Sequence, residues 1–259
     1  MHAEQEIVTV NAKPLIGGIA ALAVLGAGVG VWYLNRPAAE EASIDNALEA
    51  VAADTDPVAV SDAADDASTA DELDDVSGTW TVNTDVGTFD FADATSTFVG
   101  FRVDEVLASV GETEAVGRTP GVTGELVIDG TTLTAATIEA DFTVIESDVP
   151  RRDDAMQRAM GVAEHPTGTF VLTEPVDFGE VPTAEDRVTF SAVGDLTVNG
   201  VTNAVTLDME AQVADGNILV VGTTPVVFAD FEIETPSSPA VVSLEDNGTV
   251  EVQLWFSAA

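Results

Sequence analysis

The chain has 259 residues and a formal net charge of −38 at pH 7, because 46 aspartates and glutamates stand against 8 lysines and arginines. This balance excludes nucleic acids and anionic lipid surfaces as partners, since both require a basic patch. The chain contains no cysteine, which excludes disulfides, thiolate chemistry and cysteine-ligated zinc. The surplus of negative charge favours solubility and repulsion between copies.

An uncharged apolar run, PLIGGIAALAVLGAGVGVWYL, begins at Pro14. Its length of about twenty residues is enough to cross a hydrocarbon core as a helix. Trp32 and Tyr33 at its outer end are typical of a membrane interface. The rival interpretation is a cleaved signal peptide, whose apolar region is usually shorter and ends in a small-x-small site. We predict a cytoplasmic N-terminal tail over residues 1–13 and a transmembrane anchor over residues 14–35.

The next stretch is strongly acidic. Residues 37–77 carry thirteen acidic residues, no basic residue and no aromatic residue. Low hydrophobicity with high charge cannot offset the entropy lost on ordering. We therefore predict a disordered acidic linker over residues 36–77, which holds a folded domain away from the membrane. A helix around Ile44–Ala53 is the minor alternative.

From Gly78 onward the pattern is typical of antiparallel strands. The clearest part is a hairpin around Asn199-Gly200, in which every second residue before the turn, and every second residue after it except Asn203, is small or apolar. A period of two places one face of each strand against apolar material, and Asn-Gly suits a two-residue type I′ turn. Residues 112–121 are predicted to be a polar loop, and residues 245–248 the turn of a final hairpin. The predicted strands are 80–82, 95–106, 122–129, 131–145, 167–174, 188–198, 201–213, 218–228, 241–244 and 249–256.

One short helix is predicted after the strand that ends near residue 145. Pro150 suits its first turn, Ser147 or Asp148 is expected to cap it, and Gly161 can end it. About eight antiparallel strands with one apolar face each close naturally into a barrel. The predicted fold class is all-β: an eight-stranded antiparallel β-barrel with one short helix, over residues 78–259. A two-sheet sandwich is the alternative.

The sequence offers no catalytic or metal-binding signature. Its two histidines are His2, near the N-terminus, and the isolated His165, so a histidine-ligated metal site is not expected. Gly-Lys phosphate loops and Gly-x-Ser-x-Gly elbows do not occur. We predict that the protein is not an enzyme and needs no cofactor.

Several motifs, in this order, resemble the YceI-like domain family, and most of all its actinobacterial members. They are TSTFVGFRVDEVL, GELVIDGTTLTAATIEADF, RRDDAMQRAM followed by HPTGTFVLTEP, GDLTVNGVTNAVTL and VVFADFEI. The resemblance covers residues 78–259. It implies a lipocalin-like barrel in an extracytoplasmic protein that holds a long polyisoprenoid chain, such as a quinone tail. The Arg152-Asp153 pair matches the family pattern, whereas His165-Pro166 departs from the more usual Tyr-Pro.

The resemblance and the apolar phase of the strands together predict a barrel whose apolar side chains surround a lipid. A surface ion pair is the favoured interpretation for Arg102 and for Arg152, and the alternative is that one of them meets the lipid head group. We expect the small residues on the inner phase to leave space for the lipid. The predicted apolar lining is Phe101, Val103, Phe142, Met156, Met160, Phe170, Phe190, Ala192, Gly194, Phe228 and Phe231.

The predicted function is extracytoplasmic binding of a long-chain isoprenoid lipid. The predicted location is the cell membrane, with a single pass and the C-terminal domain outside. Burial of each methylene contributes about 0.8 kcal/mol, so a slender chain needs few polar contacts. The rival hypothesis is a ligand-free barrel that acts as a cell-surface interaction or adhesion module. The sequence also leaves a homodimer open.

Overall fold

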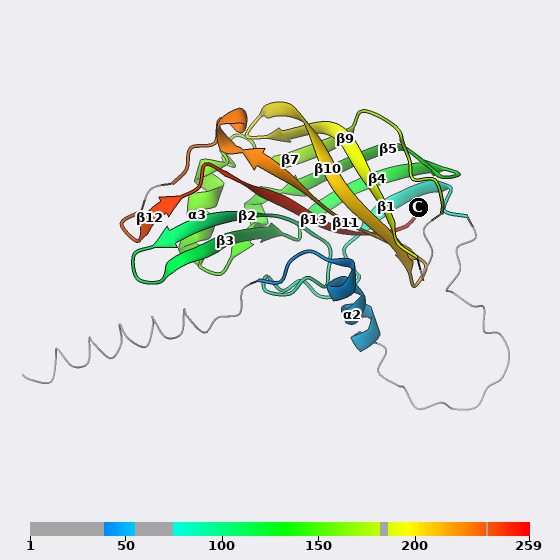
Figure 1. The fold of residues 1–259 in the computed structure, drawn as a ribbon, viewed down its shortest axis with the longest axis horizontal. Coiled ribbons are helices and arrows are strands. Elements are labelled where there is room, and N and C mark those ends of the chain that lie inside the picture. The colour runs from blue at the N-terminus through cyan, green and yellow to red at the C-terminus, as the bar shows by residue number, and fades with distance from the viewer. Residues whose placement is uncertain (1–38, 55–74, 182–185, 237) are drawn as a thin grey trace, which may run out of the picture. The chain divides into compact units, whose positions relative to one another are not determined.

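The computed structural model describes residues 39–54, 75–181, 186–236 and 238–259, and for residues 50–54 the backbone alone (Figure 1). The predicted N-terminal tail and transmembrane anchor lie outside these residues. Within the part of the chain that is described, no helix is long and apolar enough to cross a bilayer.

Eight antiparallel strands form a closed ring, which confirms the predicted barrel and not a two-sheet sandwich. Each strand pairs with its neighbours in the order β1-β4-β5-β7-β9-β10-β11-β13, and β13 pairs back to β1. The closing pairs run from Trp80 opposite Ala258 to Asn83 opposite Trp255. The strands of the ring are β1 (Gly78–Asn83), β4 (Val122–Asp129), β5 (Thr132–Asp141), β7 (Thr167–Leu172), β9 (Val188–Val198), β10 (Val201–Ala214), β11 (Asn217–Val227) and β13 (Asn247–Ala258).

β13 pairs with two strands, one after the other, along one of its edges. Its residues 255–258 pair with β1, and its residues 249–253 pair with β2. β3 pairs with β2 and continues into β4, so β2 and β3 extend the wall beyond β1 and β4. The elements at this end are β2 (Phe98–Leu107), β3 (Gly111–Thr119), β6 (Glu146–Ser147), α3 (Pro150–Ala159), β12 (Val241–Leu244) and the 3-10 turns η1 (Phe142–Val144) and η2 (Phe228–Phe231), while β8 (Val176–Asp177) pairs with β5.

The turn and helix predictions are largely confirmed. Asn199 and Gly200 both have positive φ, at 53° and 74°, as a type I′ turn requires. The helix begins with Pro150 and is followed by Gly161 at φ 63°. The expected side-chain cap is absent, because Val149 occupies the N-cap position and Ser147 bonds instead to the carboxyl of Asp153.

The prediction of a polar loop over residues 112–121 was wrong, because most of it is strand β3. At position 117 the strand has a glycine in place of a large apolar residue, because the Phe101 ring occupies the space beside Gly117. The apolar alternation that would indicate a strand is therefore missing from the sequence. A Cβ on Gly117 would lie 2.9 Å from that ring. Arg118 in the same strand is fully buried, although its charge indicated an exposed, polar loop.

The predicted final hairpin was also wrong. β12 and β13 both pair with the same edge of β2, Val241 opposite Leu107 and Thr249 opposite Arg102. The chain therefore keeps its direction through residues 245–248: residues 245–246 separate β12 from β13, and residues 247–248 already belong to β13. The reason is that the free edge of β2 accepts both segments in turn.

Part of the predicted linker is ordered. Residues 44–54 form α2 (Ile44–Asp54), which lies against the outside of the barrel (Figure 1). Ile44 and Ala47 are buried against Leu219, Val221 and Trp255, whose side chains form an apolar cluster with them. The minor alternative of a helix around Ile44–Ala53 is confirmed in place of disorder for this part of the linker. The reason is that an apolar outer face of the barrel supplies the burial that the acidic segment lacks by itself.

Candidate functional site

The inside of the ring is mainly apolar. Its main cluster combines inward residues of β1, β4, β9, β10, β11 and β13, among them Trp80, Leu126, Val213, Leu254 and Phe256. Several other inward side chains contact this cluster but stay only partly buried, although they belong to a closed ring. We infer that side chains do not fill this part of the lumen completely. These partly buried residues include Ala136, Ile138, Phe170, Leu172, Phe190, Val205 and Met209.

Four of the predicted lining residues meet at the helix end of the barrel. Met156 of α3 and Met160, which caps the end of α3, are buried with Phe142 of η1, and Phe101 of β2 packs against this group. The one-turn spacing of the two methionines places both on the face of α3 that contacts the barrel. This cluster closes the interior at the helix end, with flexible thioether side chains as its inner surface.

Phe170, Phe190, Ala192 and Gly194 lie along the middle of the lumen, as their inward phase predicts. The two phenylalanines pack against the main core, and Ala192 is buried. The expectation that Gly194 leaves space for a ligand was wrong. The Phe170 ring fills this space, because its edge lies 2.4 Å from the point where a Cβ on Gly194 would stand.

The last three predicted lining residues lie apart from both clusters. Val103 and Phe228 come together over Gly248, where a Cβ would lie 3.0 Å from Val103 and 3.5 Å from Phe228. Phe231 is buried in η2. These residues lie where β2 extends the wall beyond the ring, next to the ends of β11 and β13, so they line the rim and not the middle of the lumen.

An ion pair lies at the helix end of the barrel, beside the apolar cluster. Arg152 of α3 contacts the carboxylate of Glu105, a buried residue of β2, at 2.6 Å, and it also contacts Asp148. Burial raises the pKa of the Glu105 carboxyl above its ordinary value, the charge of Arg152 partly offsets this, and the charge of Asp148 adds to it. Of the two predicted head-group arginines, Arg152 is the one that lies next to the lumen.

The raised pKa of Glu105 has a measurable effect on stability. Below the unfolded-state pKa, about 4.3, both states hold the proton and the contribution of Glu105 is fully present. As pH rises towards the higher folded-state pKa, the unfolded chain releases its proton first, so this contribution is lost. We expect the wild type to lose stability relative to Glu105→Gln as pH rises above about 4.3, as measured by urea unfolding. A difference between the two proteins that does not vary with pH would contradict this assignment.

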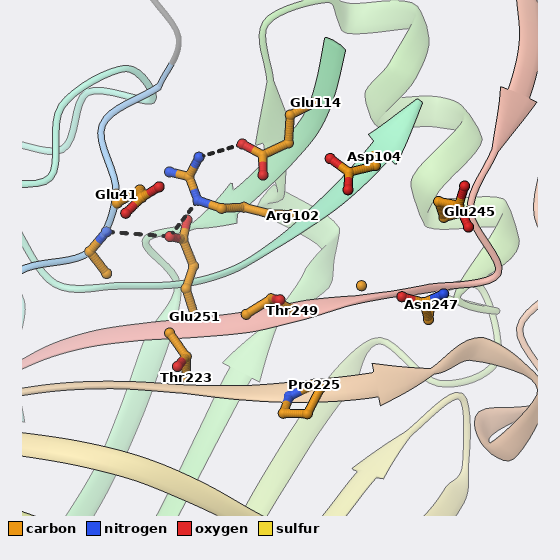
Figure 2. Close-up of a pocket in the computed structure, with 12 residues that line it drawn as sticks. Glu41, Arg102, Asp104, Glu114, Thr223, Pro225, Glu245, Asn247, Thr249 and Glu251 are labelled. Carbon is orange, nitrogen blue, oxygen red and sulfur yellow. Dashed lines mark hydrogen bonds and ion pairs between the residues drawn. The ribbon is translucent and has the colours of Figure 1, made fainter. Parts of the chain in front are cut away.

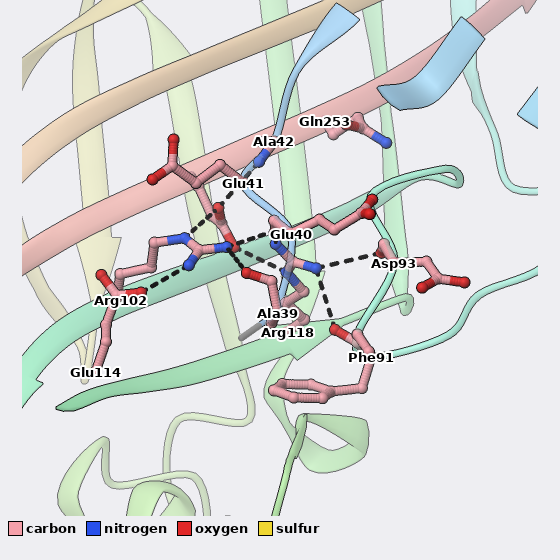
Figure 3. Close-up of polar contacts among 12 residues, drawn as sticks. Ala39, Glu40, Glu41, Ala42, Phe91, Asp93, Arg102, Glu114, Arg118 and Gln253 are labelled. Atoms are coloured by element: carbon pink, nitrogen blue, oxygen red, sulfur yellow. Dashed lines mark hydrogen bonds and ion pairs between the residues drawn. The ribbon is translucent and has the colours of Figure 1, made fainter. Parts of the chain in front are cut away.

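Arg102, the other predicted head-group arginine, points to the outside of the barrel. Its Nε lies 2.9 Å from Oε2 of Glu251, and Nη1 lies 2.7 Å from Glu114 (Figure 3). Burial by itself would lower the pKa of Arg102, but the charges of Glu251 and Glu114 raise it. The favoured interpretation of Arg102 as an ion-pair residue is therefore confirmed, and the alternative that it meets a ligand inside the barrel was wrong.

A buried charge cluster on the outer wall was missed by the sequence analysis. The two carboxylate oxygens of Glu251 are divided between Arg102 and Arg118, with Arg118 Nε at 2.8 Å. Arg118 and Glu251 are almost completely buried, and the Arg118 guanidinium lies over the Phe98 ring. The sequence carries no signal for this cluster, because charged residues on the outer phase of a strand normally face water.

A polar hollow of about 350 Å³ lies beside this cluster, also on the outside of the barrel. Five carboxylates and Arg102 line it (Figure 2). It is separate from the apolar lumen, so it is not the predicted lipid site. Among the described residues, no group of three histidine, cysteine or acidic side chains is placed to hold a metal ion.

A closed, apolar, eight-stranded barrel with one helix at its end defines a protein built to enclose a slender apolar molecule or to be filled by its own side chains. The model of the YceI-like domain family matches residues 91–256, which is more than half of the chain. The chain therefore belongs to the YceI-like domain family. No curated protein matches it.

Two of the solved structures with similar folds have 15% sequence identity to this chain. One is BcnA of Burkholderia cenocepacia, with a TM-score of 0.47, covering 61% of this chain and 95% of that chain. The other is a polyisoprenoid-binding domain from Saccharophagus degradans, with a TM-score of 0.50, covering 62% of this chain and 94% of that chain. At this identity the second similarity supports the fold alone.

Proposed function

We propose that this protein binds a lipid with a long isoprenoid chain inside its barrel. The observation that carries the proposal is the row of inward apolar side chains that stay partly buried within a closed ring. Membership of the YceI-like family supports it, and a solved neighbour in fold is described as polyisoprenoid-binding. An isoprenoid tail would complete the burial of these side chains, and each of its buried methylenes would contribute about 0.8 kcal/mol.

The polar end of the ligand is proposed to lie near α3. Arg152 and Glu105 form a partly buried ion pair next to the methionine cluster there, and a guanidinium can donate to the oxygen of a quinone or phosphate head group. No step of bond making or breaking is part of this function. The protein would sequester or carry its ligand, and one copy of the chain is enough to do so.

The proposed setting is the outer side of a cell membrane, with residues 14–35 as a single anchor. The apolar run at these positions supports the anchor, and the acidic domain is suited to an aqueous exterior. Membrane fractionation of the full chain and of a chain without residues 1–36 tests this placement. A full-length product found only in the soluble fraction would contradict it.

Organic extraction of the purified full chain, followed by mass spectrometry, tests lipid binding. We expect an isoprenoid lipid in the extract. Its amount per protein should stay the same when the protein is washed with lipid-free detergent before extraction. Repeated recovery of none, together with no uptake of added quinone, would contradict the proposal and favour the ligand-free interaction module.

A further inference from the structure

The wall of the ring is interrupted between β7 and β8. β7 ends at Leu172, and β8 begins at Val176. β7 pairs with β5 as far as Thr137, and β8 resumes the pairing at Leu133. Within the described chain, residues 134–136 of β5 therefore have no strand partner on this edge. We call this interruption the wall break.

The opposite edge of β5 is irregular at the same height. The register with β4 shifts there, since Val127 faces Ala135 but the next residue, Ile128, faces Leu133. Thr134 is thus the extra residue of a β-bulge, and its hydroxyl donates to the carbonyl of Val127 at 3.0 Å. Because hydrogen bonds between strands are what resists local opening of a wall, the ring opens most easily at the wall break.

Residues 173–181, which we call the flap, run past the wall break and carry an aromatic side chain into the lumen. Phe178 packs against the main apolar cluster, and its ring centroid lies 6.3 Å from that of Phe190 on β9. The flap is held to β5 by the two pairs of β8 and by the N–H of Phe178, which donates to the carbonyl of Thr131 at 3.0 Å. The hydroxyl of Thr131 also donates to Asp177 at 3.0 Å. Few contacts therefore keep the flap in place.

Both ends of the ring are closed by buried side chains. The methionine cluster closes the end at α3, and inward residues fill the end opposite α3 (Figure 1). Buried residues at that opposite end are Trp80, Ile128, Leu133, Val188, Val213 and Ile218. The inward residues around the wall break are instead only partly buried, namely Ala136, Leu172, Val176, Phe178 and Phe190. The incompletely filled part of the lumen thus borders on the wall break.

We propose that the wall break is the portal through which the isoprenoid ligand enters and leaves the lumen, with Phe178 as its gate, an inference that rests on the lipid binding proposed above. A barrel closed at both ends must open somewhere else to admit a ligand. Opening here separates only the contacts of the flap with β5 and Phe190, while Thr173 stays bound to Val193 of β9 through its N–H and hydroxyl. Because Arg152 lies at the other end of the lumen, the polar end of the ligand enters first and the tail ends at the portal.

A reversible staple beside the wall break tests the portal. Thr132 and Asp177 are a cross-strand pair, so their Cα atoms lie within reach of a disulfide. Their neighbours Leu133 and Val176 pack against the inner cluster, so both side chains point away from the lumen. The chain has no cysteine, and Thr132→Cys/Asp177→Cys in the full-length protein therefore carries the only two thiols.

Uptake is followed by stopped-flow quenching of tryptophan fluorescence with a ubiquinone that has two isoprene units. The disulfide is closed with oxidised glutathione, or opened with dithiothreitol that is removed before mixing. We expect uptake to be about tenfold or more slower in the disulfide form than in the dithiol form, because the flap can no longer leave β5. Equal rates in the two forms would overturn the portal.

Removal of the gate side chain tests the same portal without a new covalent bond. In Phe178→Ala we expect uptake and release of the quinone to become about fivefold faster, because the contact with Phe190 is lost. Val171→Ala is the control, since Val171 lies next to the wall break on the outer face of β7 and is 42% exposed, and its rates should equal those of the wild type. Wild-type rates in Phe178→Ala would overturn its role as the gate, and faster uptake in Met156→Ala alone would place entry at the helix end.

The portal and lipid binding fail in different ways. No quenching of the wild type by the quinone, together with no isoprenoid in its organic extract, would contradict lipid binding and with it the portal. Quenching at equilibrium with rates that neither the disulfide nor Phe178→Ala changes would contradict the portal alone and leave lipid binding intact.

Discussion

Replacing Ala136 by tryptophan is expected to lower isoprenoid capture about tenfold or more. Ala136 points into the lumen from β5, in one row with Leu172, Gly194 and Val205 across the paired strands, and it is only partly buried. An indole ring at this position would occupy space that the lipid tail needs. Exclusion of two methylenes from the lumen already costs about 1.6 kcal/mol, which is more than a factor of ten in affinity. Mass spectrometry of extracted lipid and titration with a fluorescent quinone analogue measure the loss.

The neighbouring residue supplies the control. Ala135 lies on the opposite, exposed face of β5, so Ala135→Trp adds the same ring outside the barrel and should leave capture unchanged. Urea unfolding of Ala136→Trp also separates an open lumen from a filled one. A filled interior would be overpacked and lose about 1–3 kcal/mol of stability, whereas an open lumen accepts the ring. Strong destabilisation with no effect on lipid capture would support the ligand-free module.

Glu251→Gln is expected to destabilise the barrel by about 3–5 kcal/mol, because it leaves two buried guanidinium groups without their shared counter-charge. The carboxylate of Glu251 binds Arg102 and Arg118 at 2.9 and 2.8 Å. An amide can accept from one arginine, but its NH₂ group then faces the other as a second donor. The midpoint of urea unfolding, monitored by circular dichroism, measures the loss.

Glu114→Gln is the matched control on the same wall. Glu114 binds Arg102 at 2.7 Å, but its side chain is 38% exposed, so solvent screens the pair and its loss should cost less than about 1 kcal/mol. If both variants lost the same small amount of stability, the buried cluster would not be a structural element of the wall. The docking of residues 39–49 on this wall would then be weaker than the structure indicates, because Arg102 and Arg118 donate the hydrogen bonds that hold residues 39 and 40.

The sequence predicts the secondary structure correctly wherever nearby residues determine the backbone conformation. Alternation from Val188 to Val213 predicts two long strands, and Asn199-Gly200 predicts their turn, because each signal depends only on nearby residues. Pro150 and Gly161 mark the helix in the same way. The inward phase of Phe170 and Phe190 followed from the alternation, but the space over Gly194 did not, since the ring that fills it comes from a neighbouring strand.

The sequence by itself therefore determined the strand character, most of the turns, the helix and the apolar inner face. The tertiary structure alone decided which edges pair, as when β12 and β13 share the edge of β2, and which charges are buried, as with Arg118 and Glu251. It also decided that an acidic segment lies ordered on the wall. The physical reason is that periodicity reports the two faces of one strand, whereas pairing and burial depend on surfaces that distant residues complete only after folding.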